Sequence, residues 1–249
     1  MNSLEALEAK IGTKVYHKGE LSLLQRPKVS IVGARRSGDY AKRTTYQLAN
    51  ALARRGCVVV SGGAMGIDAM AHRGAGAANT IAVVASGIDI RYPAVNKELL
   101  ASIEREGLVL SRFEEGFRPT KWSFVVRNEM VVALGEVLVV SEADIKSGSM
   151  RSVEYALDMG KPIFVLPHRL GESEGTQQLL QEGKAQAIWD IEAFADRFGQ
   201  SKPLDGFEAY LRSNPSYEEA VQKFGQKILE LELMGTIVVK GAKIYYQGE

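Results

Sequence analysis

The chain has 249 residues, of which 45% are hydrophobic and 24% are charged, as in an ordinary globular protein with a substantial core. Lysine and arginine total 31 against 30 aspartate and glutamate, so a nucleic-acid site would have to be a local basic cluster. The single cysteine excludes an internal disulfide, and the sequence shows neither a signal peptide nor a membrane span, so we expect a cytoplasmic protein without a membrane partner.

Strand and helix patterns alternate along most of the chain. Residues 1–27 are expected to form a short helical extension that ends at Pro27. Strands are predicted at residues 29–32, 57–60, 80–84, 108–110, 137–140, 163–166 and 185–188. Helices are predicted at residues 39–55, 67–77, 96–106, 126–134, 149–159 and 176–181. Strands separated by helices favour parallel pairing, which predicts an α/β domain with a doubly wound, mostly parallel sheet over residues 28–200.

A second, smaller domain is predicted after a change of composition at residues 198–203. Three short helical patterns, at residues 204–211, 217–224 and 226–234, precede a hairpin with strands at 236–239 and 243–246. This is the order of elements in a winged-helix domain, which we expect over residues 204–249. Residues 203–249 hold five lysines or arginines against seven acidic residues, a balance that disfavours duplex DNA. We therefore expect this domain to contact protein, or to bind duplex DNA weakly at most.

Polar loops follow several of the predicted strands. They lie at residues 33–38, 61–63, 86–87 and 141–149, and are rich in glycine, serine and charged residues. Because ligands of such sheets bind outside the carboxyl ends of the strands, these loops are expected to converge on one groove. A groove of backbone amides, hydroxyls and cations favours a ligand that carries phosphate.

The turn after the second predicted strand has the pattern of an anion site. Ser61, Gly62 and Gly63 break the strand, and a helix-compatible segment follows. Glycines let backbone N–H groups approach a ligand, and the first turn of a helix leaves its N–H groups free, so we expect a phosphate near this turn. The alternative is a tight turn without a ligand, because short glycine motifs are weak signals. Asp68, in the first helical turn, suits the helix dipole and is interpreted as structural.

The turn after the first predicted strand carries two arginines, Arg35 and Arg36, flanked by glycines. It is neither the GxGxxG of dinucleotide-binding proteins nor a P-loop, which argues against a dinucleotide oxidoreductase. Because the planar guanidinium group donates two hydrogen bonds at once, both side chains are expected to contact phosphate. The alternative is a pair of solvated surface arginines.

Cations and aromatic residues are interleaved between Lys121 and Asn128. Lys121 and Arg127 flank Trp122 and Phe124, a combination typical of proteins that stack the bases of single strands and hold their phosphates. With alternate residues on one face, part of this set can be buried and the rest presented. The alternative places both aromatic side chains in the core. Stacking is expected on Phe124, with Trp122 as a second candidate.

The segment Lys146-Ser147-Gly148-Ser149 opens a predicted helix. Ser147 or Ser149 is expected to cap this helix, and a cap can coexist with phosphate binding along one turn. The sequence contains no recognisable catalytic constellation, and its three histidines lack the spacing of metal ligands. We therefore expect neither catalysis nor a metal site.

Taken together, these motifs resemble the signature of the DNA-processing protein A family, DprA, also called Smf. The family pattern Ser-Gly-x-Ala-x-Gly-Ile-Asp-x-x-Ala-His is similar to residues 61–72, with Gly63 in place of a more usual leucine. Further family blocks occur in the expected order, and the resemblance covers about residues 28–190. These blocks are Ile31-Val32-Gly33-x-Arg35, Ser86-Gly87 with Tyr92-Pro93-x-x-Asn96, Phe124-x-x-Arg127-Asn128, Lys146-Ser147-Gly148-Ser149, and Glu174-Gly175-Thr176 with Leu179-Leu180-x-x-Gly183.

The resemblance implies an extended Rossmann-like domain that binds single-stranded DNA in natural transformation and recombination. It implies a homodimer that protects incoming strands and loads the RecA recombinase onto them, without a cofactor and without catalysis. Together with the residue patterns it gives these expected DNA contacts: Arg35, Arg36, Ser61, Gly62, Gly63, Lys121, Phe124, Arg127, Asn128, Lys146, Ser147, Gly148 and Ser149.

One departure from the family and one rival function bear on this expectation. Glu129 stands where the family usually has an arginine after Arg127-Asn128, so one phosphate contact is expected to be missing. The rival is a Rossmann-like nucleoside-monophosphate hydrolase of the lysine-decarboxylase-like class, whose Pro-Gly-Gly-x-Gly-Thr-x-x-Glu motif resembles residues 148–154, with Glu154 as the acid. Its proline and threonine are absent, and Met150 replaces a glycine, so we favour DNA binding.

Overall fold

The structure is a computed structural model that describes residues 2–200, 206–233 and 237–246. The chain divides into two compact units, Met1–Ser201 and Lys202–Glu249, and each has a hydrophobic core of its own. None of the helices in the described ranges combines the length and the apolar character that a membrane crossing requires.

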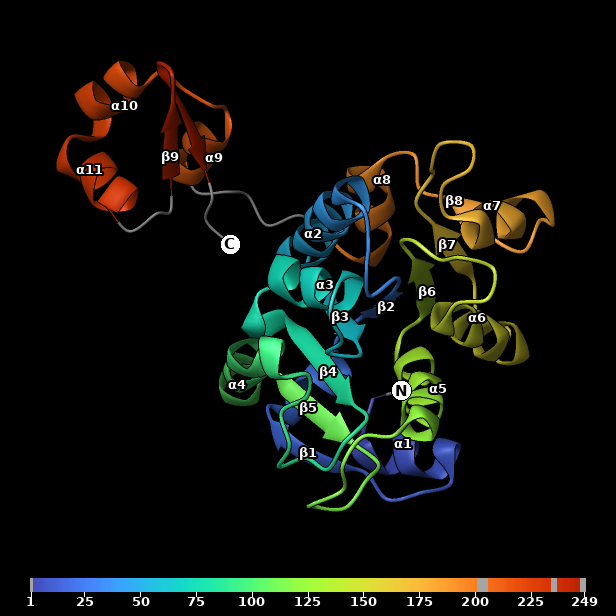
Figure 1. Cartoon of the computed structure of the whole chain (residues 1–249). Helices are drawn as coiled ribbons and strands as arrows, with labels where there is room; N and C mark the ends of the chain where they lie inside the picture. Colours follow the sequence, from blue (N-terminus) through green and yellow to red (C-terminus); the bar gives the residue numbers. More distant parts are fainter. Residues whose placement is uncertain (1, 201–205, 234–236, 247–249) are drawn as a thin grey trace. The chain divides into compact units, whose positions relative to one another are not determined.

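The larger unit is built on one eight-stranded sheet in the order β1-β5-β4-β3-β2-β6-β7-β8 (Figure 1). All neighbouring strands are parallel except β1 and β5. The strands are β1 (Tyr16–Gly19), β2 (Lys28–Val32), β3 (Val58–Ser61), β4 (Thr80–Val84), β5 (Leu108–Ser111), β6 (Val137–Val140), β7 (Ile163–Val165) and β8 (Gln186–Ala187). The predicted α/β class and doubly wound, mostly parallel sheet are confirmed.

Helices cover both faces of this sheet because its central strands consist of short apolar runs. One face carries α2 (Asp39–Arg54), α3 (Ile67–Ala75), α4 (Lys97–Glu106) and α8 (Ile191–Ala195). The other carries α1 (Leu4–Ile11), α5 (Lys121–Leu134), α6 (Gly148–Asp158) and α7 (Glu174–Gln181). Short 3-10 turns at Leu21–Gln25, Ala77–Asn79, Ala94–Asn96 and Asp196–Phe198 connect some of these elements.

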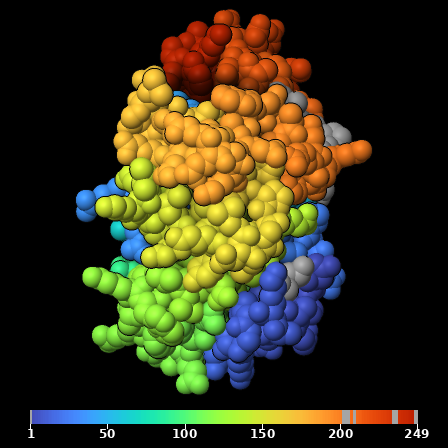
Figure 2. All heavy atoms as spheres, turned by 90° about the vertical axis from the view of Figure 1, so that its right-hand side faces the viewer, coloured from blue at the N-terminus to red at the C-terminus, as the bar shows by residue number. Residues whose placement is uncertain are grey.

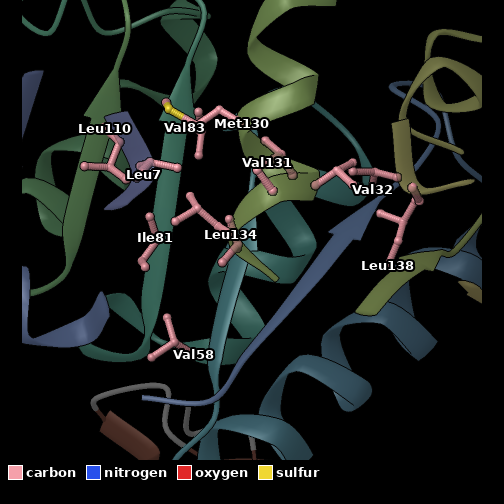
Figure 3. Close-up of a cluster of buried hydrophobic side chains, with 14 of the residues drawn as sticks. Leu7, Val32, Val58, Ile81, Val83, Leu110, Met130, Val131, Leu134 and Leu138 are labelled. Carbon is pink, nitrogen blue, oxygen red and sulfur yellow. The ribbon is translucent and has the colours of Figure 1, made fainter. Parts of the chain in front are cut away.

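The side chains of each strand alternate between the two cores. In β3, Val58 and Val60 belong to the core under α5, whereas Val59 belongs to the core under α2 and α3. Figure 3 shows the first of these cores, in which Ile81 and Val83 of β4 face side chains of α5. This packing fixes the position of α5, the helix that carries the interleaved aromatic and cationic residues.

The N-terminal segment is not the helical extension that its sequence predicts. It contains α1, whose Leu7 is fully buried in the main core, and the edge strand β1, which pairs antiparallel with β5. The pairing brings Gly19 so close to Gly107 that a Cβ atom on Gly19 would lie 2.1 Å from the carbonyl oxygen of Gly107. Since the partner strand of β1 is distant in sequence, local patterning gave no sign of it.

Helix α5 begins one turn earlier than predicted. Thr120 caps it by accepting a hydrogen bond from the N–H of Ser123, and the Ser123 hydroxyl accepts one in return from the N–H of Thr120. Lys121, Trp122 and Phe124 therefore lie on a helix, and the expected alternation of faces with a period of two residues is wrong for them.

The smaller unit has three helices followed by a hairpin, in the order expected from the sequence. They are α9 (Gly206–Arg212), α10 (Tyr217–Phe224), α11 (Gln226–Leu233), β9 (Ile237–Lys240) and β10 (Lys243–Tyr246). Its core comprises Leu211, Ala220, Ile228, Ile237 and Ile244. The expected helix start at residue 204, helix end at 234 and strand start at 236 lie outside the described residues.

The strand order of the large sheet predicts where a ligand binds. From β2 the chain runs through β3 and β4 to β5 on one side, and β6, β7 and β8 lie on the other side. The order therefore reverses between β2 and β6. In open sheets of this kind the crevice outside the carboxyl ends of these two strands is the usual ligand site.

Candidate nucleic-acid interface

A cleft of about 580 Å³ opens at this reversal point, between the loop after β2 and the first turns of α5 and α6. The green segment that contains α5 borders the yellow segment that contains α6 on the face shown in Figure 2. Eight of the sequence-predicted contacts line the cleft: Arg35, Lys121, Phe124, Arg127, Asn128, Ser147, Gly148 and Ser149.

An arginine and two aromatic rings are stacked at one side of the cleft. The guanidinium carbon of Arg35 lies 4.5 Å from the centre of the half-buried Phe124 ring. The Tyr92 ring is tilted against the same Phe124, with the ring centres 6.0 Å apart. Arg35 is exposed above this stack, so its cationic group is held at the cleft by a cation–π contact while its donors remain accessible.

Arg127 lies at the floor of the cleft and is only 4% exposed. Its Nη1 is 3.6 Å from Oδ2 of Asp68, and its Nε has no hydrogen-bond partner within the described ranges. Burial lowers the pKa of the Arg127 guanidinium, while Asp68 opposes this shift and Arg35 adds to it. A buried cation with an unused donor that borders a cleft is suited to an anionic ligand.

Gly62 provides the space for Arg127. A Cβ atom at Gly62 would lie 1.0 Å from Nη1 of Arg127, so any larger residue would displace the guanidinium group. Gly62 thus has a definite role beside the cleft, although it is not the role that the sequence predicts for it.

The structure does not place the predicted phosphate cradle at Ser61, Gly62 and Gly63 on the wall of this cleft, because all three residues are buried and their polar groups already have partners. The Ser61 hydroxyl donates to the carbonyl oxygen of Ile31. The N–H of Gly62 donates to Asp68, as does the N–H of Ala64. Asp68 therefore takes the position that a phosphate was expected to take, and its interpretation as structural agrees with these contacts.

His72 contacts the same turn from the core side. It is fully buried, and its Nε2 accepts the N–H of Gly63 at 3.2 Å, so this nitrogen carries no proton. Its Nδ1–H therefore donates to Oγ1 of Thr80, which in turn donates to the carbonyl oxygen of Val59. Burial, with a smaller effect of Arg127, lowers the pKa of His72 to about 3.

The first turn of α6 forms the opposite side of the cleft. Ser147 is the N-cap residue, yet its side chain makes no capping hydrogen bond, contrary to the expected cap, and its hydroxyl has no partner in the described parts of the chain. The hydroxyl of Ser152, one turn later and also at the cleft, is likewise unpartnered there. Because the first N–H groups of a helix lack intrahelical acceptors, this end of α6 can receive an anion.

Arg36 and Lys146 are exposed and do not line the cleft. Together with the buried Ser61, Gly62 and Gly63, they are the predicted contacts that the structure does not place on its walls. Among the described residues, no cluster of histidine, cysteine or acidic side chains could hold a metal ion.

The sequence model of the family described as DNA recombination-mediator protein A matches residues 3–199. The chain belongs to this family. It is 37% identical over 173 residues to DNA processing protein DprA of Streptococcus pneumoniae, a match that covers 68% of this chain and 61% of that protein. The chain thus spans less than two thirds of the length of this curated relative.

Two solved structures of family members share the fold. DNA processing protein A from Helicobacter pylori, whose structure was described for its single-stranded DNA binding mode, is 44% identical with a TM-score of 0.72, covering 74% of this chain and 86% of that one. The S. pneumoniae DprA structure is 35% identical with a TM-score of 0.69, covering 75% and 66% of the two chains.

The position that departs from the DNA recombination-mediator family pattern has its own partner. Glu129 pairs with Arg112, whose Nη1 lies 2.9 Å from Oε2 and also donates to the carbonyl oxygen of Val126. Glu129 does not line the cleft. It is therefore accommodated by an ion pair behind the cleft wall.

Nothing in the described cleft favours the rival hydrolase. Glu154, the expected acid, does not line the cleft, is exposed and pairs with Arg151 at 2.7 Å. A general acid must reach the reacting group, and this carboxylate is instead paired with Arg151, which itself lines the cleft.

Several cleft residues were missed by the sequence analysis. Tyr92, Thr120 and Val125 line the cleft, as does Ser152, but none was selected as a contact. Tyr92 belongs to one of the family blocks, but the position of its exposed ring beside Phe124 depends on the path of the loop after β4, which the local sequence does not predict.

Proposed function

We propose that the cleft binds single-stranded DNA with little regard to base sequence. The observation that carries this proposal is Arg127, a buried cation with an unused donor at the floor of a cleft whose wall holds the aromatic rings of Phe124 and Tyr92. Cations combined with aromatic rings are the usual means of holding a single strand. Membership of the family supports the proposal, as does the single-stranded DNA binding described for the H. pylori relative.

The roles of the side chains follow from their positions. Arg127 and the start of α6 would hold one phosphate at the cleft floor, and Lys121 would hold a neighbouring one at the rim. Arg35 covers Phe124, so a base would stack on this cation–aromatic pair or on Tyr92. Such stacking requires an unpaired base, because both faces of a base within a duplex are already stacked.

We further propose the cellular role that membership of the family suggests. The protein would act in natural transformation and recombination in the cytoplasm as a non-catalytic homodimer that protects incoming single strands and promotes loading of RecA. The smaller unit, a winged-helix-like domain in this proposal, would contact protein and bind duplex DNA weakly at most, since acidic residues outnumber basic ones in it.

The cleft proposal is tested with fluorescence anisotropy on labelled dT oligonucleotides and a matched duplex. The wild type is expected to prefer the single strand. Phe124→Ala should lose about 1–3 kcal/mol of binding free energy, because it removes the ring that supports both Arg35 and a stacked base. Tyr245→Ala, which changes an exposed aromatic residue of the smaller unit, serves as the control and should bind like the wild type. Equal affinities of the wild type and Phe124→Ala would remove this ring from the site.

A further inference from the structure

Trp122 presents a large aromatic surface next to the cleft without lining it. It is the second residue of α5 and is 61% exposed. Its ring meets Phe113 edge to face, with ring centres 5.8 Å apart, and the buried Phe113 is itself stacked on Phe117. The indole is thus anchored on a fixed aromatic base while most of its surface faces solvent.

The aromatic ring inside the cleft is less available. Phe124 is half-buried and its face is covered by the Arg35 guanidinium. In the segment that interleaves cations with aromatic residues, Trp122 is therefore the ring with the larger uncovered surface. Rings with open faces are the ones on which unpaired bases stack.

The position of Trp122 suits a strand that leaves the cleft. Its neighbour Lys121 lines the cleft, and so does Val125, one turn further along the same face of α5. Arg118, two residues before the helix cap, is exposed and forms no ion pair with any described residue. A strand that passes Lys121 on its way out would meet the indole next.

We propose that Trp122 is a second base-stacking platform, outside the cleft, for the nucleotide that leaves the cleft past Lys121. The proposal rests on the proposed function and adds a contact to it. The exposed Glu114 and Glu115 precede Arg118 on the same loop, so acidic and basic side chains nearly balance each other beside Trp122. Stacking, and not phosphate attraction, would therefore provide the interaction.

The two tryptophans of the chain allow a direct test. Trp189→Phe leaves Trp122 as the only tryptophan, and Trp122→Phe leaves only Trp189, which is 82% exposed after β8 and away from the cleft lining. Titration of both full-length variants with dT oligonucleotides of increasing length should quench the fluorescence of Trp122 but leave that of Trp189 unchanged. Quenching should begin only above the length that the cleft alone accommodates.

Affinity gives a second readout. Trp122→Ala should weaken binding of long dT oligonucleotides roughly tenfold, leave short ones unaffected, and keep the salt dependence of the wild type. Trp189→Ala is the matched control and should bind as the wild type does. If Trp122 fluorescence is not quenched and Trp122→Ala binds with wild-type affinity, Trp122 is not a stacking platform. If Phe124→Ala nevertheless binds single strands more weakly than the wild type, the cleft proposal remains intact. Absence of single-strand binding by the wild type would overturn both.

Discussion

Arg127 shows how one residue links the fold to the site. Its guanidinium group is buried, lies beside Asp68, and occupies a volume that exists only because residue 62 has no side chain. In the proposed function this charge holds a phosphate, and Asp68 makes its burial tolerable through a partial ion pair.

This arrangement predicts the effect of Gly62→Ala. The added Cβ would overlap with Arg127, so the variant should lose roughly 1–3 kcal/mol of folding free energy in urea unfolding and bind single strands more weakly. Gly148→Ala is the control for stability, since a Cβ there meets nothing within 4 Å. If both variants unfold at the same urea concentration as the wild type, Gly62 has no such role.

Residue chemistry alone predicted part of the site. Arg35, Lys121, Phe124 and Arg127 were selected because cations near aromatic residues suggest single-strand binding, and the structure brings them to one cleft. Ser61, Gly62 and Gly63 do not line the cleft, because glycines that admit a buried side chain have the same sequence pattern as glycines that admit a phosphate. Only the hydrogen bonds to Asp68 and His72 distinguish the two cases.

At the scale of elements, the turn between β3 and α3 depends on a neutral His72. Between pH 6.5 and about 3 the unfolded chain binds a proton on this residue that the folded protein does not bind. The contribution of neutral His72 to the free energy of unfolding is therefore fully present above pH 6.5 and declines as the pH falls toward 3. At about 1.4 kcal/mol per pKa unit, the difference between 6.5 and about 3 amounts to roughly 5 kcal/mol at most.

The prediction is checked by urea unfolding at a series of pH values. His72→Gln should be less stable than the wild type at pH 7 and should lose less stability between pH 6.5 and 4, because it lacks the titrating group. His17→Gln alters an exposed histidine and should retain the wild-type pH dependence. If the free energies of unfolding of the wild type and His72→Gln changed equally with pH, His72 would not be the source of the pH dependence.

Helix α5 is held at its C-terminal end by Lys161. Its ammonium group donates to the carbonyl oxygens of Val132 and Ala133 at 2.6 and 2.8 Å and also to that of Gly135. These carbonyls lack intrahelical donors. Lys161→Met should therefore cost roughly 2 kcal/mol in thermal or urea unfolding, whereas Lys184→Met, at an exposed ion pair, should cost little. Equal stability of the two variants would contradict this assignment.

The start of α5 shows why element boundaries were predicted less well than element types. The apolar pattern began at residue 126, but the helix begins at Lys121 because Thr120 and Ser123 form a reciprocal cap. The residues of the cap are present in the sequence, but the aromatic residues that follow them alternate as in a strand, and this pattern obscures the start of the helix. The strand β1 was missed for a different reason, since it exists only by pairing with β5.

At the scale of the whole molecule, the alternation of strands and helices was sufficient to predict the doubly wound sheet and hence the position of the cleft at its reversal point. The loops at residues 33–38 and 141–149 reach the cleft as the sequence predicts, but the contributions of Tyr92 and Ser152 were not predicted. Tyr92 and Ser152 arrive there from the loop after β4 and from α6, and their convergence depends on the packing of the whole sheet.

The salt dependence of DNA binding tests most directly whether this cleft holds the phosphates of a single strand. Anisotropy titrations of a dT oligonucleotide across a salt series would compare the wild type with Arg35→Ala and with Arg36→Ala, whose side chain lies outside the cleft. Arg35→Ala is predicted to bind more weakly and to lower the log–log salt slope by about 0.7, the value for one phosphate contact on a single strand. Arg36→Ala is predicted to follow the wild type. Equal slopes for the wild type and Arg35→Ala, or tighter binding of duplex than of single strand, would show that the cleft does not hold the phosphates of a single strand through Arg35.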